Sequence, residues 1–514
     1  MLTLLIFLTS FVSLSLWFLF KDNKDIRGIF GKTFLGSFGL YLGLVFLMPG
    51  VVISWTTLTI NLLFLFGAGF FLNTFSSSKI IFLPMLTLLT LGYYYGVRGI
   101  DWFPFSDGEP IENVDAAIPS NLDENNELLI EISEGHQVKE LNGIAKKYNL
   151  VLTPAFSVAD EDATELDDYY AANIPASEMK YYNEIVAALN NSGLVDYVES
   201  NEVLSLDPKE GVGSTEPARR GKYSANDPDI DKVWGYDAMK VETLYQLLAT
   251  EQVAPKKKAR IAIIDTGVDG KHEDLKDNFV SIAAKHNEDP HGHGTHCAGI
   301  AAAVSNNATG IASFTPNNTF VEVTSVKVFG KYGNTTQQVI INGMLEAVDN
   351  GADVLSMSLG GPSTAKRQRA YKQAVKYANK KGAIVVVAAG NENVDARKRV
   401  PASVEGVITV AALDSELKKA SFSNDVGALK MGIAAPGVQV YSTIPNNKYE
   451  YFNGTSMATP YVAGLLGMMK SIRPELTTQQ AYEILKQTGE NTRNTKATGK
   501  LIQPSEAVKA LLKK

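Results

Sequence analysis

Apolar residues are distributed unevenly along this chain, and their spacing divides it into three parts. The first part contains four long apolar stretches, at residues 1–20, 33–48, 51–72 and 80–97. Each is near the ~20 residues that a helix needs to cross a bilayer. The first 100 residues include only eight charged side chains, whereas the polarity after Asp101 is that of an ordinary globular chain. We therefore predict that residues 1–98 form a membrane anchor of about four transmembrane helices.

The charged loops between these stretches predict how the anchor is oriented. The loop at residues 21–32 has four basic residues, the next loop has no charge, and the third loop ends in Lys79. By the positive-inside rule the first and third loops are cytoplasmic, so both ends of the anchor lie outside the cytoplasm. The first stretch has neither the basic start nor the small-residue cleavage site of a signal peptide, which favours an uncleaved helix. The expected location is the cell membrane, with the rest of the chain outside the cytoplasm.

The second part, residues 126–207, mixes short strand and helix patterns. It lies between an acidic linker at 99–125 and a linker at 208–225 that is rich in glycine, proline, serine and charge. Apolar and β-branched content and periodicity predict a strand at 128–132, helices at 138–148 and 181–189, and a strand at 195–198. This order indicates a small α+β domain of the ferredoxin-like kind.

The third part, residues 226–514, alternates apolar runs with amphipathic helices. The runs expected as buried strands are residues 260–264, 321–328, 354–358, 384–389 and 407–412. The expected helices are residues 335–349, 364–381, 455–471 and 478–487. This alternation is typical of an α/β fold, a parallel sheet with helices on both faces. In such sheets the reacting groups gather at the carboxyl ends of the strands.

Charge and cysteine content exclude some classes of function. The chain has a net charge of −7, and since residues 1–100 contribute +4 from six basic and two acidic side chains, the remainder carries about −11. A nucleic-acid partner is therefore not expected, because it requires a basic surface. The single cysteine, Cys297, excludes an intrachain disulfide and a CxxC metal site.

Four polar residues stand where apolar segments of the third part begin or end. Asp265 ends an apolar run, and a carboxylate buried there requires a partner. His293 lies in the sequence His-Gly-His-Gly-Thr-His, and Asn391 follows another strand. Ser456, in Asn-Gly-Thr-Ser-Met-Ala-Thr-Pro, stands at the start of a helix, where unpaired N–H groups and the helix dipole favour negative charge.

These segments, in the order Asp, His, Asn, Ser, resemble those of the subtilisin family of serine proteases, the subtilases. The resemblance covers about residues 226–514 and implies that Asp265, His293 and Ser456 are a catalytic triad. His293 would take the proton of Ser456, while Asp265 would hold the imidazole tautomer and stabilise its cation. The Asn391 amide and the Ser456 N–H would hold the oxyanion. No cofactor is expected for catalysis.

The same resemblance implies a set of substrate-binding residues. Two extended segments would pair with the substrate backbone, which implies a protein or peptide substrate. They are Gly333, Asn334 and Thr335, and Ser358, Leu359 and Gly360. Ala389 and Gly390 would line the pocket for the side chain before the cut bond, with Arg399 near its base. The Arg399 guanidinium could pair there with an acidic side chain, or it could face solvent on a basic loop.

Two hypotheses concern metals. Asp274 and Asn306 match positions that hold calcium in many subtilases, but the adjoining loop looks shortened, so a structural calcium ion and its absence are both open. A zinc cluster of His291, His293 and His296 is the alternative to the triad. It lacks the glutamate of an H-E-x-x-H motif and leaves the other triad residues unexplained.

The second part adds to the resemblance. Residues 194–203 resemble the closing strand of the inhibitory propeptide that precedes subtilase catalytic domains. Such a propeptide would place its C-terminal tail in the active-site cleft, and the enzyme would cut the linker that follows. We expect the cut between Glu210 and Gly211 rather than at the dibasic pair further on, and not after Asp207, because a proline follows it. An unrelated stalk domain is the alternative.

These features predict a membrane-anchored serine endopeptidase made as a self-processed zymogen. The competing hypothesis is a membrane pseudoprotease that binds peptides or partner proteins without cutting them. The presence of all four catalytic residue types argues against it. The expected partners are protein or peptide substrates, the chain's own propeptide and the membrane.

Overall fold

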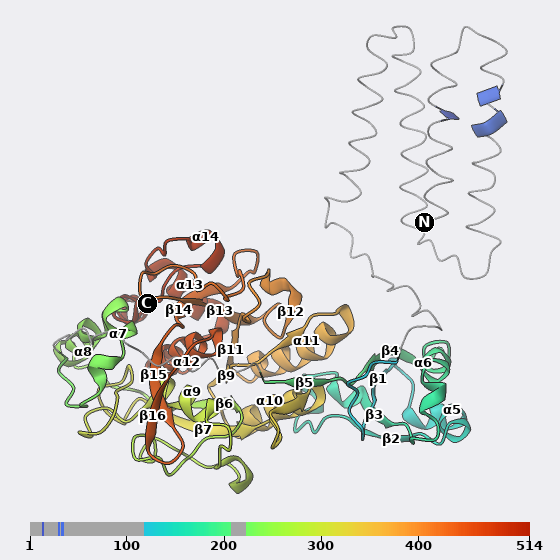
Figure 1. The fold of residues 1–514 in the computed structure, drawn as a ribbon, viewed down its shortest axis with the longest axis horizontal. Coiled ribbons are helices and arrows are strands. Elements are labelled where there is room, and N and C mark those ends of the chain that lie inside the picture. Colours follow the sequence, from blue (N-terminus) through green and yellow to red (C-terminus); the bar gives the residue numbers. More distant parts are fainter. Residues whose placement is uncertain (1–12, 15–28, 31, 35–117, 207–222, 514) are drawn as a thin grey trace. The chain divides into compact units, whose positions relative to one another are not determined.

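The computed structural model describes residues 13–14, 29–30, 32–34, 118–206 and 223–513 (Figure 1). Among these residues no helix is both long and apolar enough to cross a membrane. The four predicted transmembrane stretches lie almost entirely outside the described residues, as do most of the acidic linker and the predicted cut at Glu210. The chain divides into two units, Met1–Gly108 and Glu109–Lys514, and the elements below belong to the second.

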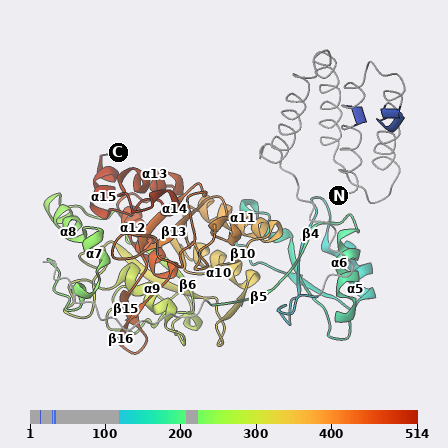
Figure 2. The ribbon, with the colours of Figure 1, turned by 45° about the horizontal axis from the view of Figure 1, so that its top comes forward.

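Residues 118–202 form a small domain, here called the N-terminal domain. Its main elements are β1 (Leu128–Ile132), α5 (Asn142–Lys147), β2 (Val151–Pro154), β3 (Tyr169–Asn173), α6 (Tyr182–Asn190) and β4 (Val195–Ser200). The strands form one antiparallel sheet in the order β2-β3-β1-β4. Figure 2 shows both helices on one side of this sheet. The elements therefore follow the order β-α-β-β-α-β.

Residues 223–513 form the larger C-terminal domain, which is built on a six-stranded sheet (Figure 1). Its strands are β6 (Ala259–Asp265), β7 (Val321–Lys327), β9 (Val354–Met357), β11 (Ile384–Ala388), β13 (Val407–Leu413) and β14 (Gly432–Pro436). Their order across the sheet is β14-β13-β11-β9-β6-β7, and every pairing is parallel. The predicted parallel sheet is confirmed.

Helices cover both faces of this sheet. One face is covered by α9 (His293–Ala302), α12 (Thr455–Ile472) and α13 (Thr478–Thr488), with α15 (Pro504–Leu512) and α8 (Val241–Thr250) packed in the same core outside them; the other is covered by α10 (Gln337–Asp349) and α11 (Ala365–Lys380). In β6, Ile261 and Ile263 belong to the first core, and Ala262 and Ile264 belong to the second. Because both faces are buried, the strands are apolar throughout instead of alternating.

The N-terminal domain packs against the second of these cores. In β1, Leu128 and Ile130 pack with Ile185 of α6 inside the domain, whereas Leu129 joins the core formed by α10 and α11. Successive side chains of a strand point to opposite faces, so β1 is buried on both sides. Figure 1 shows β5 (Val203–Ser205) leaving this domain toward the C-terminal domain.

Several strands were not predicted. β2 is exposed along most of its length, and β14 consists of Gly-Ile-Ala-Ala-Pro, so neither shows a long apolar run. The antiparallel hairpin of β15 (Val440–Ile444) and β16 (Lys448–Phe452) was also missed. These strands depend on pairing with their neighbours more than on local preference.

Candidate active site

Residues from three distant segments come together at the carboxyl edge of the parallel sheet. Asp265 is the last residue of β6, His293 is the first residue of α9, and Ser456 is the second residue of α12. α9 and α12 pack against each other on the same face of the sheet. Cys297 of α9 links the three positions, because its Sγ lies 3.5 Å from the Ser456 carbonyl oxygen and within 4.8 Å of side-chain atoms of Asp265 and His293.

Asp265 and His293 form a buried pair. His293 Nδ1 lies 2.8 Å from Asp265 Oδ1, and the two side chains are 7% and 0% exposed. The same Oδ1 accepts the backbone N–H of Thr266 at 2.7 Å. A Cβ added at Gly294 would lie 2.1 Å from the carbonyl oxygen of Gly267, so glycine is required for α9 to approach the end of β6 this closely. With a carboxylate at Nδ1, the basic nitrogen of the imidazole is Nε2.

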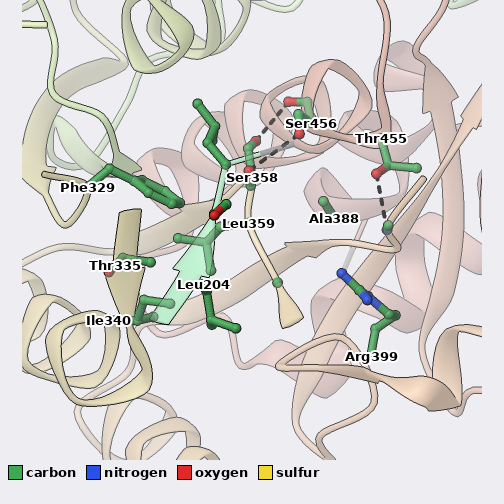
Figure 3. A pocket seen from close by; sticks show the side chains of 14 residues that line it. Leu204, Phe329, Thr335, Ile340, Ser358, Leu359, Ala388, Arg399, Thr455 and Ser456 are labelled. Atoms are coloured by element: carbon green, nitrogen blue, oxygen red, sulfur yellow. Dashed lines mark hydrogen bonds between the residues drawn. The ribbon is translucent and has the colours of Figure 1, made fainter. Parts of the chain in front are cut away.

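Ser456 lies in the first turn of α12, a helix whose eighteen residues are all buried. The backbone N–H groups of a first turn have no partner within the helix, and the positive end of the helix dipole is located there. Ser456 Oγ donates a long hydrogen bond of 3.3 Å to the Ser358 carbonyl, and Ser358 Oγ donates to the Ser456 carbonyl at 2.7 Å (Figure 3). The hydroxyl is therefore only weakly held by Ser358.

Asn391 is oriented by the residue before the serine. Its Oδ1 accepts both the backbone N–H and the Oγ1–H of Thr455, each at 2.9 Å. Thr455 Oγ1 in turn accepts the N–H of Gly390 at 3.1 Å. These bonds fix the amide plane relative to the start of α12. The sequence named Asn391 but not Thr455, whose role appears only when the two segments are adjacent.

The chain itself occupies the cleft beside these residues. β5 pairs antiparallel with β8 (Asn334–Thr336), matching Leu204 to Thr335 and Ser205 to Asn334. The pairing continues with a 2.8 Å hydrogen bond from the N–H of Leu206 to the carbonyl of Gly333. We call residues 203–206 the tail. Figure 3 shows Leu204 of the tail near Thr335 and Ile340, in a pocket that extends to Ser456.

On the far side of the tail this pocket continues to Arg399, and we call that end the Arg399 pocket. It is lined by Ser358, Leu359, Gly360, Ala388, Gly390, Arg399 and Ser456. The Arg399 side chain is 17% exposed and pairs with Glu392 at 2.8 Å, so it does not extend into solvent as Arg397 does. Ala389, which the sequence placed in the lining, lies instead in a small core with Ala411, because its side chain points away from the pocket.

The histidines of the proposed zinc cluster do not converge. His291 Nε2 lies 3.2 Å from the carbonyl of Gly330, and His296 Nε2 lies 3.0 Å from that of Glu450. Among the described residues, one group of three or more histidine, cysteine or carboxylate side chains has metal-ligand spacing, and it consists of Asp265, His293 and Cys297. Burial raises the pKa of the Cys297 thiol well above its ordinary value, which disfavours the thiolate that a metal requires.

The proposed calcium position contains Asn307 in place of Asn306. Asn307 Nδ2 donates to Asp274 Oδ1 at 2.8 Å, and the N–H of Asn307 donates to Asp227 Oδ1 at 3.2 Å. The Asn306 side chain turns away and donates to the carbonyl of Pro316. Burial raises the pKa of Asp274 to about 7, and Asp227 adds to the rise. Two neighbouring carboxylates, one of them fully buried, fit a hard cation such as calcium.

Comparisons with known proteins extend over most of the C-terminal domain. Residues 256–503 match the model of the subtilase family. Subtilisin DY of Bacillus licheniformis is 43% identical over 239 residues, which are 45% of this chain and 84% of that protein. Thermitase of Thermoactinomyces vulgaris is 41% identical over 254 residues, 48% of this chain and 86% of that protein. A thermophilic serine proteinase of Bacillus sp. strain AK1 is 36% identical over 341 residues, 63% of this chain and 78% of that protein.

Proposed function

This chain belongs to the subtilase family and is a subtilisin-like serine protease, and from that premise we propose that Asp265, His293 and Ser456 are its catalytic triad. The observation that carries the assignment is the buried Asp265–His293 pair, 2.8 Å apart, beside a helix that begins at the serine. The reaction is endoproteolysis of protein substrates through an acyl-enzyme.

The proposed mechanism gives each residue of the triad a role. His293 Nε2 takes the proton of Ser456 as Oγ attacks the substrate carbonyl carbon, and it then gives this proton to the leaving amine. Asp265 holds the imidazole through Nδ1 and stabilises its cation. Water then attacks the acyl-enzyme, and His293 again takes a proton and returns it to the leaving group, which is now Ser456 Oγ. The 3.3 Å bond from Ser456 to Ser358 is long, so little is lost when Oγ turns to the substrate.

The oxyanion forms between the Ser456 N–H and the Asn391 amide. Donors that are fixed before the reaction stabilise a developing charge without having to reorganise. The two hydrogen bonds from Thr455 supply this fixation, since they hold the amide oxygen and thereby direct the amide nitrogen.

The N-terminal domain acts as an inhibitory propeptide. The tail pairs with β8 as an extended substrate would, and it reaches the pocket that contains Ser456. The alignment with the proteinase of strain AK1 extends beyond the C-terminal domain. It covers 63% of the chain, whereas residues 226–514 make up 289 of 514 residues, or 56%, so it must include residues before 226.

Membrane attachment and maturation complete the proposal. Residues 1–98 anchor the protein in the cell membrane through about four helices, and the catalytic domain lies outside the cytoplasm; both points rest on the sequence. A cut between Glu210 and Gly211 would remove the covalent tether. N-terminal sequencing of the mature protein tests this. A start at Gly211 supports it, and an active chain that stays intact contradicts the propeptide role.

A structural calcium ion is part of the same proposal. Asp274 and Asp227 would bind it, together with Asn307 after a half-turn of its amide, because Asn307 now faces Asp274 with its nitrogen. The ion would neutralise a buried carboxylate and stabilise the loop, and it has no part in the chemical steps.

A fluorophosphonate probe tests the proposed activity. Such probes label an activated serine, so we expect labelling of the processed protein and none in Ser456→Ala. The competing pseudoprotease would bind peptides without reacting. A folded, processed protein that is not labelled would therefore contradict the proposed function.

A further inference from the structure

The Arg399 pocket has one charged side chain among the described residues that line it, and that side chain is directed inward. Figure 3 shows the Arg399 guanidinium pointing toward Ala388 and not outward along the loop. Only 17% of the side chain is exposed. Ser358, Leu359, Gly360 and Ser456 line the same pocket. A substrate side chain that enters beside Ser456 therefore meets a guanidinium.

Glu392 holds this guanidinium from one side. Arg399 Nη2 lies 2.8 Å from Glu392 Oε1. The other oxygen, Oε2, accepts a hydrogen bond from Nδ2 of the buried Asn424 at 2.7 Å, and Asn424 Oδ1 accepts the backbone N–H of Glu392 at 3.2 Å. Glu392 is thus tied to Asn424 at two points. It fixes the position of Arg399 without surrounding it.

Arg399 keeps donors that Glu392 does not use. A guanidinium carries five N–H donors in a planar fork. Within the described residues, Arg399 Nε is buried and has no hydrogen-bond partner. A buried donor without an acceptor costs free energy, which a ligand that brings an acceptor recovers. A carboxylate matches the fork best, because it can accept two parallel hydrogen bonds from it.

We propose that Arg399 makes this enzyme select substrates with an acidic side chain immediately before the cut bond. This rests on the proposed function, because it takes Ser456 as the nucleophile. Glu392 is a positioning residue. Its negative charge also partly neutralises the guanidinium, and it therefore limits the preference for acidic substrates. A basic side chain would meet the guanidinium directly. The two carboxylate oxygens of Glu392 could not offset this repulsion, because they already bond to Arg399 and Asn424.

The sequence of the tail agrees with this preference. The paired tail ends with the bond from Leu206 to Gly333. The next residue in the sequence is Asp207, and Glu210 follows soon after. Of these two acidic residues, Glu210 precedes the expected cut, whereas Pro208 disfavours a cut after Asp207.

Peptides that differ only in the residue before the cut bond test the proposal. The processed protein is assayed on peptides with glutamate, glutamine, leucine or lysine at that position. We expect kcat/KM for glutamate to exceed that for glutamine by about 10- to 100-fold, the range of charge-assisted hydrogen bonds, with lysine the poorest substrate. A kcat/KM for glutamate equal to or below that for glutamine would overturn the proposal.

Single substitutions test whether the preference for glutamate depends on Arg399. Arg399→Gln should bring the glutamate-to-glutamine ratio close to one. Glu392→Gln should raise this ratio, because glutamine keeps an oxygen that can position Arg399 but removes the competing negative charge. Lys398→Ala is the matched control, because it removes an exposed charge from the same loop and should leave the ratio unchanged.

An unchanged ratio in Arg399→Gln, or a lower one in Glu392→Gln, contradicts the proposal. If Arg399→Gln does not fold, the glutamate-to-glutamine ratios of the wild type and of Glu392→Gln still test the proposal. Failure of the proposed function is distinct, since no peptide would then be cut and Ser456 would not be labelled.

Discussion

The contact between the N-terminal domain and α11 centres on Arg369. Its Nε lies 2.6 Å from Glu131 Oε2, and its Nη2 donates to Glu131 Oε1 at 2.9 Å. Nη2 also contacts Asp196 at 3.2 Å, and the guanidinium lies over the ring of Tyr197, 4.4 Å from its centroid. The Glu131 side chain is 4% exposed and that of Arg369 is 34% exposed. Burial raises the pKa of Glu131, and the charge of Arg369 opposes the rise.

We predict that Arg369→Ala weakens the docking of the N-terminal domain and so raises the activity of the uncut chain. Removing one partner of a buried ion pair costs about 3–5 kcal/mol, because the other charge is left without compensation. The cost here is smaller for two reasons. Arg369 is partly solvated, and Glu131 can take up a proton instead of remaining charged. We expect about 2–3 kcal/mol, which corresponds to docking weakened roughly 30- to 150-fold.

The assay is the initial rate of hydrolysis of a short peptide by the purified full chain, taken before a gel shows any cut. Lys376→Ala, at an exposed position of the same helix, is the matched control and should not raise the rate. Replacing Glu131 and Arg369 together by glutamine should restore most of the inhibition, since neither charge is then left unpaired. An unchanged rate in Arg369→Ala, or an equal rise in the control, would refute the reasoning.

The oxyanion assignment predicts that Asn391→Ala lowers kcat by about 10²–10³ with little change in KM; a loss confined to KM would contradict it. The raised pKa of Asp274 predicts how the stability of the calcium-free protein depends on pH. This pKa of about 7 lies above the ordinary 3.8, so the folded protein keeps a proton that the unfolded chain releases. Thermal melts of a Ser456→Ala background in EDTA should therefore show stability falling by about 3 kcal/mol between pH 4 and 7, whereas Asp274→Asn should show no such fall and no gain from calcium. A wild-type stability that rises with pH over this range would refute this. On topology, protease added to spheroplasts should cut the segment after Asp101, and protection until lysis would reverse the proposed orientation.

Much of the C-terminal domain could be predicted because its signals are local. A strand buried on both faces must be apolar throughout, so β6, β9 and β11 are visible as short apolar runs. The exposed β2 carries no such run, and in β14 glycine and proline flank a run of only three apolar residues, so neither could be predicted. The same limit applies to the site: the sequence named Asn391 from its motif but could not show that Thr455 holds it.

From the sequence alone, five of the six parallel strands and the candidate triad could be named, because each depends on residues that are close in the sequence. The division into three parts stays a prediction. Which side chains meet depended on how the chain folds. The tertiary structure placed Asn307 rather than Asn306 at Asp274, turned Ala389 away from the pocket, and paired Arg399 with Glu392. The physical reason is that a side chain's direction is set by the backbone at its own position, and its partner is set by how distant segments pack. Neither can be read from spacing along the chain.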